Sequence, residues 1–296
     1  MTVAPRNYGF AFRTKGSIKS HYAIIGMATV ADNYPLYYDA TNECGVSMAG
    51  LNFPENACYF PVMDRKDNIA PFEFIPWILS QCRNLSEVKV LLSNINLCNI
   101  DFSDKLPLSP LHWMVSDKEG AITVESKADG LKIYDNPVGV LTNNPSFDYH
   151  MTHLCDYINL TPQAPENRFG EVALSTYSRG MGAIGLPGDL SSASRFVRAA
   201  FVKLNSVSGE DENVSISQFF HILGGVEQQR GCVRLPDGSY EITAYTSCMN
   251  MDKGIYYYTT YENHAINAVD MKRCDLEGKE LYRYPLRKEQ QVTFQN

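Results

Sequence analysis

The sequence predicts an α+β fold, with strands grouped in hairpins apart from paired helices. Three observations predict it: apolar extended runs separated by short turns, two neighbouring stretches with helical spacing of apolar residues, and no regular alternation of strand and helix. Such grouping is typical of layered α+β proteins rather than of alternating parallel ones. No linker or internal repeat interrupts the chain, so a single domain over residues 1–296 is expected.

The first strands are expected at residues 22–30, 36–40 and 46–53, where apolar and β-branched residues are dense. Asparagine and glycine at 42–45 give the turn signal between the second and third of them. This hairpin would bring Asn52 to the end of a strand.

Two helices and a loop are expected next. The first helix begins near Pro71, which suits a first helical turn, and Ser86 is the expected N-cap of the second. The loop at residues 99–110 carries two apolar side chains, Phe102 and Leu106, which require a packing or binding reason.

The remaining elements follow the same two periodicities. Strands are expected at residues 111–116, 121–125, 131–134, 242–249 and 255–261. Helices are expected at 147–158, 194–204 and 215–223. Residues 142–145 form a polar corner, and the glycine-rich stretch at 180–189 lacks the spacing and the ending of a phosphate-binding loop.

Charge and hydropathy exclude several classes of partner. The formal net charge is -7 and no polybasic run occurs, so a nucleic-acid partner is not expected. No apolar stretch reaches the roughly 18 residues of a membrane span, and residues 1–19 show no signal-peptide core. No C-x-x-C pair occurs among the 8 cysteines, which predicts reduced thiols in a cytoplasmic protein without a metal site.

Longer strings of sequence carry a more specific signal. They lie in order along nearly the whole chain: N-E-C-G at 42–45, A-G-L-N-F-P at 49–54, L-H-W at 111–113 with V-E at 124–125, G-V-L-T-N-N-P at 139–145, G-L-P-G-D at 185–189 with A-S-R-F at 193–196, and Y-T-S-C at 245–248 with Y-Y-Y-T-T-Y at 256–261. Together these blocks resemble the choloylglycine hydrolase family.

The resemblance implies a fold, an activity and an assembly. The fold is the αββα sandwich of N-terminal nucleophile hydrolases, in which two stacked antiparallel sheets lie between helix layers. The activity is hydrolysis of the amide bond that joins a bile acid to glycine or taurine, without a metal or an organic cofactor. The resemblance also implies a homotetramer whose small-molecule partners are conjugated bile salts.

The family's nucleophile is a cysteine at the mature N-terminus, whose own α-amine can serve as the base. This chain begins with Met1 and Thr2, and the resemblance aligns them with a strand that follows the family's first strands. The chain as given is therefore expected to lack the first strands and the cysteine, and to be inactive, because loss of a nucleophile lowers the rate by about 10⁶.

Three catalytic residues carry over from the resemblance. Asn52 and Asn143 are assigned to the oxyanion hole, and Arg195 to the network that holds the nucleophile. Each has a simpler interpretation. The asparagines suit a strand end and a turn, and Arg195 could be a surface residue at a helix start that pairs with Asp189.

Five residues bear on the substrate. An asparagine at position 52 favours bile salts over penicillin V, because the penicillin V acylases of this family carry an aromatic residue there. Phe102 and Leu106 match positions that line the family's steroid pocket, although anchoring of the loop to the core would also explain them. Ser178 and Arg179 match a pattern associated with taurine conjugates, whose sulfonate a guanidinium can bind.

Three other functions remain open. The chain could be a bile-salt-binding homologue without catalysis, or a penicillin V acylase. Alternatively, Thr2 could act as an N-terminal threonine nucleophile after removal of Met1.

Overall fold

The computed structural model describes all 296 residues, which form two compact units. The first unit comprises Met1–Asn144 and Ile242–Asn296, and the second unit comprises Pro145–Glu241. The expected single domain over residues 1–296 stays a prediction. No helix is both long and apolar enough to cross a lipid bilayer.

The first unit is built on an antiparallel sheet of eight strands in the order β11-β10-β9-β6-β5-β4-β1-β15. Six of its strands confirm predicted ones: β4 Ile24–Ala31, β5 Tyr34–Asn42, β6 Ser47–Asn52, β9 Leu111–Asp117, β10 Gly120–Lys127 and β11 Gly130–Asp135. The other two, β1 Thr2–Ala4 and β15 Tyr282–Arg283, complete the sheet.

A second sheet of three antiparallel strands confirms the predicted C-terminal hairpin and adds one strand. It contains β12 Tyr245–Asn250, β13 Ile255–Thr260 and β14 Asn263–Asp270. Two short pairs complete the strands: β2 Phe10–Phe12 with β3 Gly16–Ile18, and the parallel pair β7 Asp67–Ile69 with β8 Ile95–Leu97.

The helices of the first unit are α1 Phe74–Leu79, preceded by η1 Pro71–Glu73, and α2 Leu85–Leu92, with η4 Met271–Arg273 near the C-terminus. The expectation that Ser86 caps α2 is wrong. The side chain of Asn84 accepts a 2.9 Å hydrogen bond from the backbone N–H of Glu87. Asn84 has the extended backbone of an N-cap, so the helix already includes Ser86.

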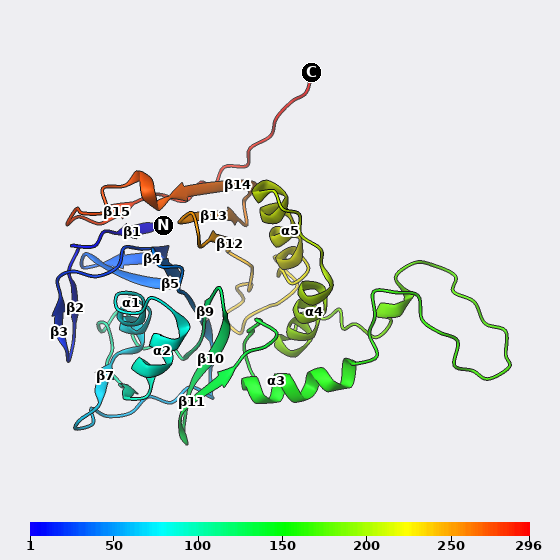
Figure 1. Cartoon of the computed structure of the whole chain (residues 1–296), viewed down its shortest axis with the longest axis horizontal. Coiled ribbons are helices and arrows are strands. Elements are labelled where there is room, and N and C mark those ends of the chain that lie inside the picture. Colours follow the sequence, from blue (N-terminus) through cyan, green and yellow to red (C-terminus); the bar gives the residue numbers. More distant parts are fainter. The chain divides into compact units, whose positions relative to one another are not determined.

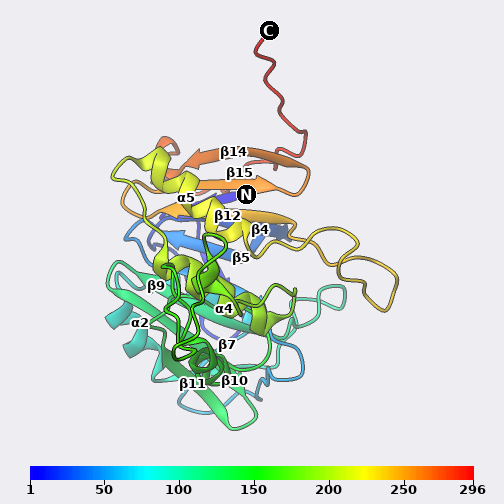
Figure 2. The same cartoon turned by 90° about the vertical axis from the view of Figure 1, so that its right-hand side faces the viewer.

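Two apolar cores cover the two faces of the large sheet. Buried residues of α1 and α2, including Phe74 and Leu79, pack against one face with Ile24 and Trp113. On the other face Ile25 packs with residues of β13. Figure 1 shows α1 and α2 on one side of β4 and β5 and β14 on the other, and Figure 2 shows the same order for α2, β5 and β14. The first unit therefore has a helix layer and two stacked sheets.

The second unit confirms the three predicted helices. They are α3 Phe147–Leu154, continued by η2 Cys155–Tyr157, α4 Ser192–Asn205 and α5 Glu212–Gly224. A long segment that contains only η3 Met181–Ala183 joins α3 to α4 (Figure 1). The ring of Phe196 on α4 lies 6.2 Å from that of Phe147 and 4.6 Å from that of His150, which fixes α3 against α4.

Candidate active site

The structure brings together two of the three predicted catalytic residues, Asn52 and Asn143. Asn52 is the last residue of β6, where it pairs with Leu111 of β9. The side-chain Nδ2 of Asn143 donates a 2.8 Å hydrogen bond to the backbone oxygen of Asn52. The next residue, Asn144, donates to the backbone oxygen of Pro54 over 2.6 Å. These two bonds attach the polar corner to the chain at the end of β6.

The side chain of Asn52 is exposed and forms no hydrogen bond within the chain. Its Nδ2 hydrogens therefore remain available to an incoming oxygen atom. Its backbone is fixed, because the N–H of Phe53 donates to the oxygen of Pro110 over 2.7 Å and Asn143 holds its own carbonyl. A free donor on a fixed backbone is the arrangement that stabilises a developing oxyanion.

A network around Asn136 shapes the approach to the corner. Its Nδ2 donates to the oxygen of Val140 over 2.9 Å, and its Oδ1 accepts a 2.8 Å bond from the N–H of Gly139. Gly139 has a φ of 59°, which a residue with a side chain rarely adopts. The path of the chain into Asn143 is therefore set by buried hydrogen bonds.

A buried histidine contacts the neighbours of both asparagines, and the sequence analysis assigned it no role. The ring of His112 is fully buried and stacks on the ring of Phe53, with 4.2 Å between centroids and 6° between planes. Its Nε2 lies 2.7 Å from the oxygen of Thr142, and its Nδ1 lies 3.1 Å from Oε1 of Glu125. His112 and Glu125 belong to motif strings that the resemblance had already identified.

Glu125 is itself fully buried on β10. Its second oxygen lies 3.8 Å from the ammonium of Lys127, which also donates a 3.0 Å bond to the hydroxyl of Tyr134. A buried carboxylate requires such compensation by hydrogen bonds and opposite charge.

Arg195 belongs to the second unit. It lies in the first turn of α4, and its Nε donates to the oxygen of Leu190 over 3.1 Å. Partial burial lowers the pKa of its guanidinium, and the charge of Glu241 opposes that effect. A partly buried arginine is better suited to a binding site than to a solvated surface.

The alternative pairing of Arg195 with Asp189 is wrong. The carboxylate of Asp189 accepts a 2.9 Å bond from the N–H of Ser191 and a 2.5 Å bond from the hydroxyl of Ser194. The hydroxyl of Ser191, followed by that of Ser194 and the N–H of Ser191, holds the pKa of Asp189 below its usual range. Asp189 therefore organises the start of α4 rather than neutralising Arg195.

The two apolar loop residues have different surroundings. The ring of Phe102 lies 5.2 Å from that of Phe72 and 6.1 Å from that of Tyr34, and the guanidinium of Arg13 lies 5.6 Å from its centroid. Leu106 lies at a turn and is 37% exposed. Phe102 thus anchors the loop, whereas Leu106 leaves an apolar surface open.

Ser178 and Arg179 are exposed in the long segment between α3 and α4 of the second unit. Arg179 forms no hydrogen bond or ion pair within the chain. The structure leaves its guanidinium available for a ligand, and their role in substrate binding stays a prediction.

Thr2 does not have the surroundings of a nucleophile. It lies in β1 between β4 and β15, and it is 1% exposed. The ammonium group of Met1 donates to the oxygen of Tyr284 over 2.9 Å. A substrate cannot approach a hydroxyl enclosed between two strands, which excludes the threonine-nucleophile alternative for this fold.

All eight cysteines are free thiols. Burial raises the pKa of Cys44 and Cys98, that of Cys82 to about 12 and that of Cys248 to about 11. These four remain protonated at neutral pH, and a protonated thiol is a poor nucleophile.

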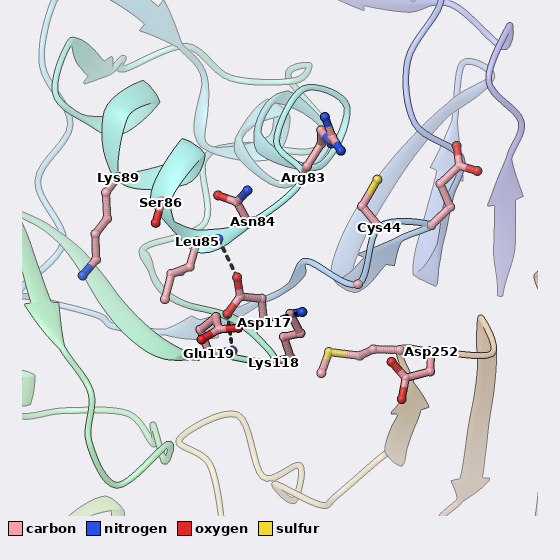
Figure 3. A pocket seen from close by; sticks show the side chains of 13 residues that line it. Cys44, Arg83, Asn84, Leu85, Ser86, Lys89, Asp117, Lys118, Glu119 and Asp252 are labelled. Carbon is pink, nitrogen blue, oxygen red and sulfur yellow. Dashed lines mark hydrogen bonds and ion pairs between the residues drawn. The ribbon is translucent and has the colours of Figure 1, made fainter.

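A cavity of about 760 Å³ lies elsewhere in the first unit, at the start of α2 (Figure 3). None of the predicted site residues lines it. Within it the carboxylate of Asp117 accepts bonds from the N–H groups of Leu85, over 2.7 Å, and Glu119, over 2.8 Å. The cavity wall mixes both signs of charge, and no group of three or more histidine, cysteine, aspartate or glutamate residues in the chain could hold a metal ion.

Known proteins resemble this chain over nearly its whole length. The model of the choloylglycine hydrolase family, described as linear amide C–N hydrolases, matches residues 1–284. A bile salt hydrolase/transferase from Lactiplantibacillus plantarum is 56% identical over 100% of this chain and 92% of its own length. One from Clostridium perfringens is 40% identical over 99% of this chain and 90% of its own length.

Solved structures agree. A variant of the conjugated bile acid hydrolase from Clostridium perfringens superposes with a TM-score of 0.92 at 39% identity, over 100% of this chain and 91% of that one. A penicillin V acylase from Agrobacterium tumefaciens superposes with a TM-score of 0.71 at 20% identity, over 95% of this chain and 81% of that one. At that identity the second likeness shows the fold alone.

These likenesses confirm the αββα fold of N-terminal nucleophile hydrolases. The family match begins at residue 1 and gives no support to the expectation that the family's first strands are missing. The order of the motif strings, the fold and the identities lead to one conclusion: this chain belongs to the choloylglycine hydrolase family of linear amide C–N hydrolases.

Proposed function

We propose that this protein hydrolyses the amide bond of bile salts conjugated to glycine or taurine. The observation that carries the proposal is the fixed pair of Asn52 and Asn143, with the unpaired side-chain amide of Asn52 beside it. Family relatives with 56% and 40% identity are named as bile salt hydrolases, which supports the choice of substrate.

The asparagine pair stabilises the tetrahedral intermediate of acyl transfer. Attack on the amide carbonyl places a negative charge on its oxygen, and Nδ2 of Asn52 donates a hydrogen bond to it. Asn143 holds Asn52 through the backbone, and Arg195 supplies positive charge to the nucleophile network. Removing one such donor typically lowers kcat by about 10²–10³.

The nucleophile in this proposal is the N-terminal cysteine of the family. Position 2 of this chain is Thr2, whose hydroxyl is buried. Hydrolysis in this proposal requires that cysteine. A protein in which the family's N-terminal segment with its Met-Cys start precedes residue 1 should therefore release glycine or taurine, and residues 1–296 should carry the binding of conjugated bile salts.

Four further residues are assigned to the substrate. Leu106 and Phe102 would contact the apolar steroid, and Ser178 and Arg179 would bind the sulfonate of taurine. A guanidinium can donate two parallel hydrogen bonds to a sulfonate, whereas an ammonium group cannot, so arginine is the better partner for it. The homotetramer and the cytoplasmic location stay predictions.

The test is a side-by-side assay of two proteins, one with residues 1–296 alone and one with the Met-Cys segment added. Release of taurine from taurocholate, glycine from glycocholate and 6-aminopenicillanic acid from penicillin V is measured, and calorimetry measures binding of each substrate. We expect binding of both bile salts to each protein and turnover by the extended one only.

Each other outcome is informative. Faster turnover of penicillin V than of either bile salt would replace the proposed substrate. Turnover by the 296-residue protein would show that the expected need for an added cysteine is wrong while leaving the activity intact. Absence of bile-salt binding to both proteins would overturn the proposal.

A further inference from the structure

We propose that His112 is a positioning residue for the two asparagines of the active site. Its ring contacts both chain segments that carry them. One face stacks on Phe53, the neighbour of Asn52, and Nε2 bonds to the oxygen of Thr142, the neighbour of Asn143. The inference rests on the proposed function, because it gives the ring a role in that site.

Hydrogen-bond chemistry defines how the ring is held. The oxygen of Thr142 is an acceptor only, so Nε2 of His112 carries the hydrogen of their 2.7 Å bond. The 3.1 Å contact between Nδ1 and Glu125 also contains a hydrogen, carried by the ring or by the carboxyl group. Both ring nitrogens of His112 therefore have a polar partner, which suits the complete burial of the ring.

The contacts form a closed series of hydrogen bonds, covalent links and one ring stack that joins the two asparagines. His112 bonds to Thr142, the chain leads to Asn143, and Asn143 bonds to the oxygen of Asn52. The chain then leads to Phe53, whose ring returns to His112. Because the series is closed, a shift of the His112 ring would displace both asparagines.

Small displacements matter in such a site. An oxyanion donor must lie about 2.7–3.1 Å from the developing charge, and its supporting contacts must hold it to about 0.5 Å. Glu125 is the outer support, because it fixes the orientation of the ring through Nδ1 in the way that carboxylates orient catalytic histidines.

Two substitutions separate positioning from simple packing. The amide nitrogen of His112→Gln reaches about as far as Nε2, so this variant keeps the bond to Thr142 and loses the one to Glu125. The amide of His112→Asn reaches about as far as Nδ1, so it keeps Glu125 and loses Thr142. Both lose the stack on Phe53, so their losses of thermal stability should be similar.

The first readout is hydrogen exchange of the Asn143 side-chain amide, measured by NMR on the 296-residue protein. We expect exchange about tenfold faster in His112→Asn than in the wild type, because that bond opens more often, and within about twofold of the wild type in His112→Gln. His21→Asn serves as the control, since His21 is also buried and contacts an aromatic ring, that of Phe10 at 4.7 Å with the planes tilted by 47°. It should leave the Asn143 exchange unchanged.

The second readout uses the Met-Cys-extended protein. We expect kcat for taurocholate to fall about 10²-fold in His112→Asn with KM within about threefold, and less than about tenfold in His112→Gln. Equal exchange rates in the two variants, at equal melting temperatures, would overturn the positioning role. If the extended wild type shows no hydrolysis, the proposed function fails, and the exchange experiment still decides the role of His112.

Discussion

The carbonyl oxygen of Asn52 accepts a hydrogen bond from the side chain of Asn143, 91 residues further along the chain, over 2.8 Å. The bond uses the backbone of Asn52 and leaves its own side-chain amide exposed. One asparagine therefore serves as the support and the other presents the donor.

Substitution of Asn52 by alanine should separate activity from stability. We expect kcat of the extended protein to fall about 10²–10³-fold, because the oxyanion loses a donor. The free energy of unfolding should change by less than about 0.5 kcal/mol, because the side chain forms no hydrogen bond within the chain. Steady-state kinetics and urea denaturation measure the two effects. Asn56→Ala, which removes only a 3.3 Å bond to the oxygen of Pro54, is the control and should retain activity.

Two arginines of α4 should respond in opposite ways. Arg198 donates to the backbone oxygens of Gly225, over 2.6 Å, and Pro187, over 2.9 Å, so Arg198→Lys should lower the melting temperature and leave kcat nearly unchanged. Arg195→Lys should lower kcat about tenfold or more with a smaller change in melting temperature. Calorimetry and kinetics on the extended protein check both. Equal losses of kcat in the two variants would show that Arg195 has no specific role in the active site.

Arg179 should determine preference between conjugates. We expect Arg179→Ala to lower kcat/KM for taurocholate about tenfold relative to glycocholate, the size of one charge-assisted hydrogen bond. Arg168→Ala, another exposed arginine of the same segment, should leave the ratio unchanged. A wild type that clearly prefers glycocholate would refute the assignment directly.

Leu106 and Phe102 should affect different properties. Leu106→Ala should raise KM for bile salts several-fold without loss of stability, because this side chain already faces solvent in the absence of substrate. Phe102→Ala should lower the free energy of unfolding by about 2 kcal/mol, because it removes a ring from an aromatic cluster. An unchanged KM for bile salts in Leu106→Ala would show that Leu106 does not contact the steroid.

Asp39 should make stability depend on pH. Its carboxylate on β5 accepts 2.5 Å bonds from the hydroxyls of Tyr245 and Tyr256, and so joins the two sheets. Burial raises its pKa above the ordinary value of 3.8, and the tyrosine bonds only partly oppose this. The folded state therefore binds the proton more tightly than the unfolded state, and the contribution of Asp39 is largest below pH 3.8 and declines as the pH rises.

Asp39→Asn provides the measurement, because its neutral amide does not titrate. The stability of the wild type minus that of Asp39→Asn should fall as the pH rises from about 4 to 7. Asp39→Ala leaves the buried hydroxyl of Tyr256 without its acceptor. This substitution should lower the free energy of unfolding by about 1–3 kcal/mol. A difference that grows with pH would contradict the raised pKa.

The sequence predicted the longer helices and eight of the strands because each of these has a clear apolar period, whereas short strands such as β2, β3, β7 and β8 were missed. The motif strings pointed to Asn52, Asn143 and Arg195, and the structure brings the two asparagines together. One contact that the sequence analysis missed, between His112 and Glu125, could have been predicted. The turn that pairs Asp117 with Gly120 places His112 opposite Glu125 by counting back along both strands. A buried histidine beside a glutamate could have been inferred from that register.

Other features could not be inferred from local patterns. The bond from His112 to Thr142 requires the polar corner to lie against the sheet, and the bonds from Asp39 reach tyrosines 206 and 217 residues away. The cap of α2 was misjudged for a local reason: Asn84 and Ser86 are both good capping residues, and only the backbone angles select between them.

The position of β1 determines when folding can finish. Its partner β15 contains Tyr282 and Arg283, about 280 residues further along the chain, so this pair of strands cannot form before those residues have been synthesised. Contacts between such distant parts of a chain form slowly, because a long loop has to close first. Synthesis of β15, rather than emergence of β1, therefore sets the moment at which this edge of the large sheet can be completed.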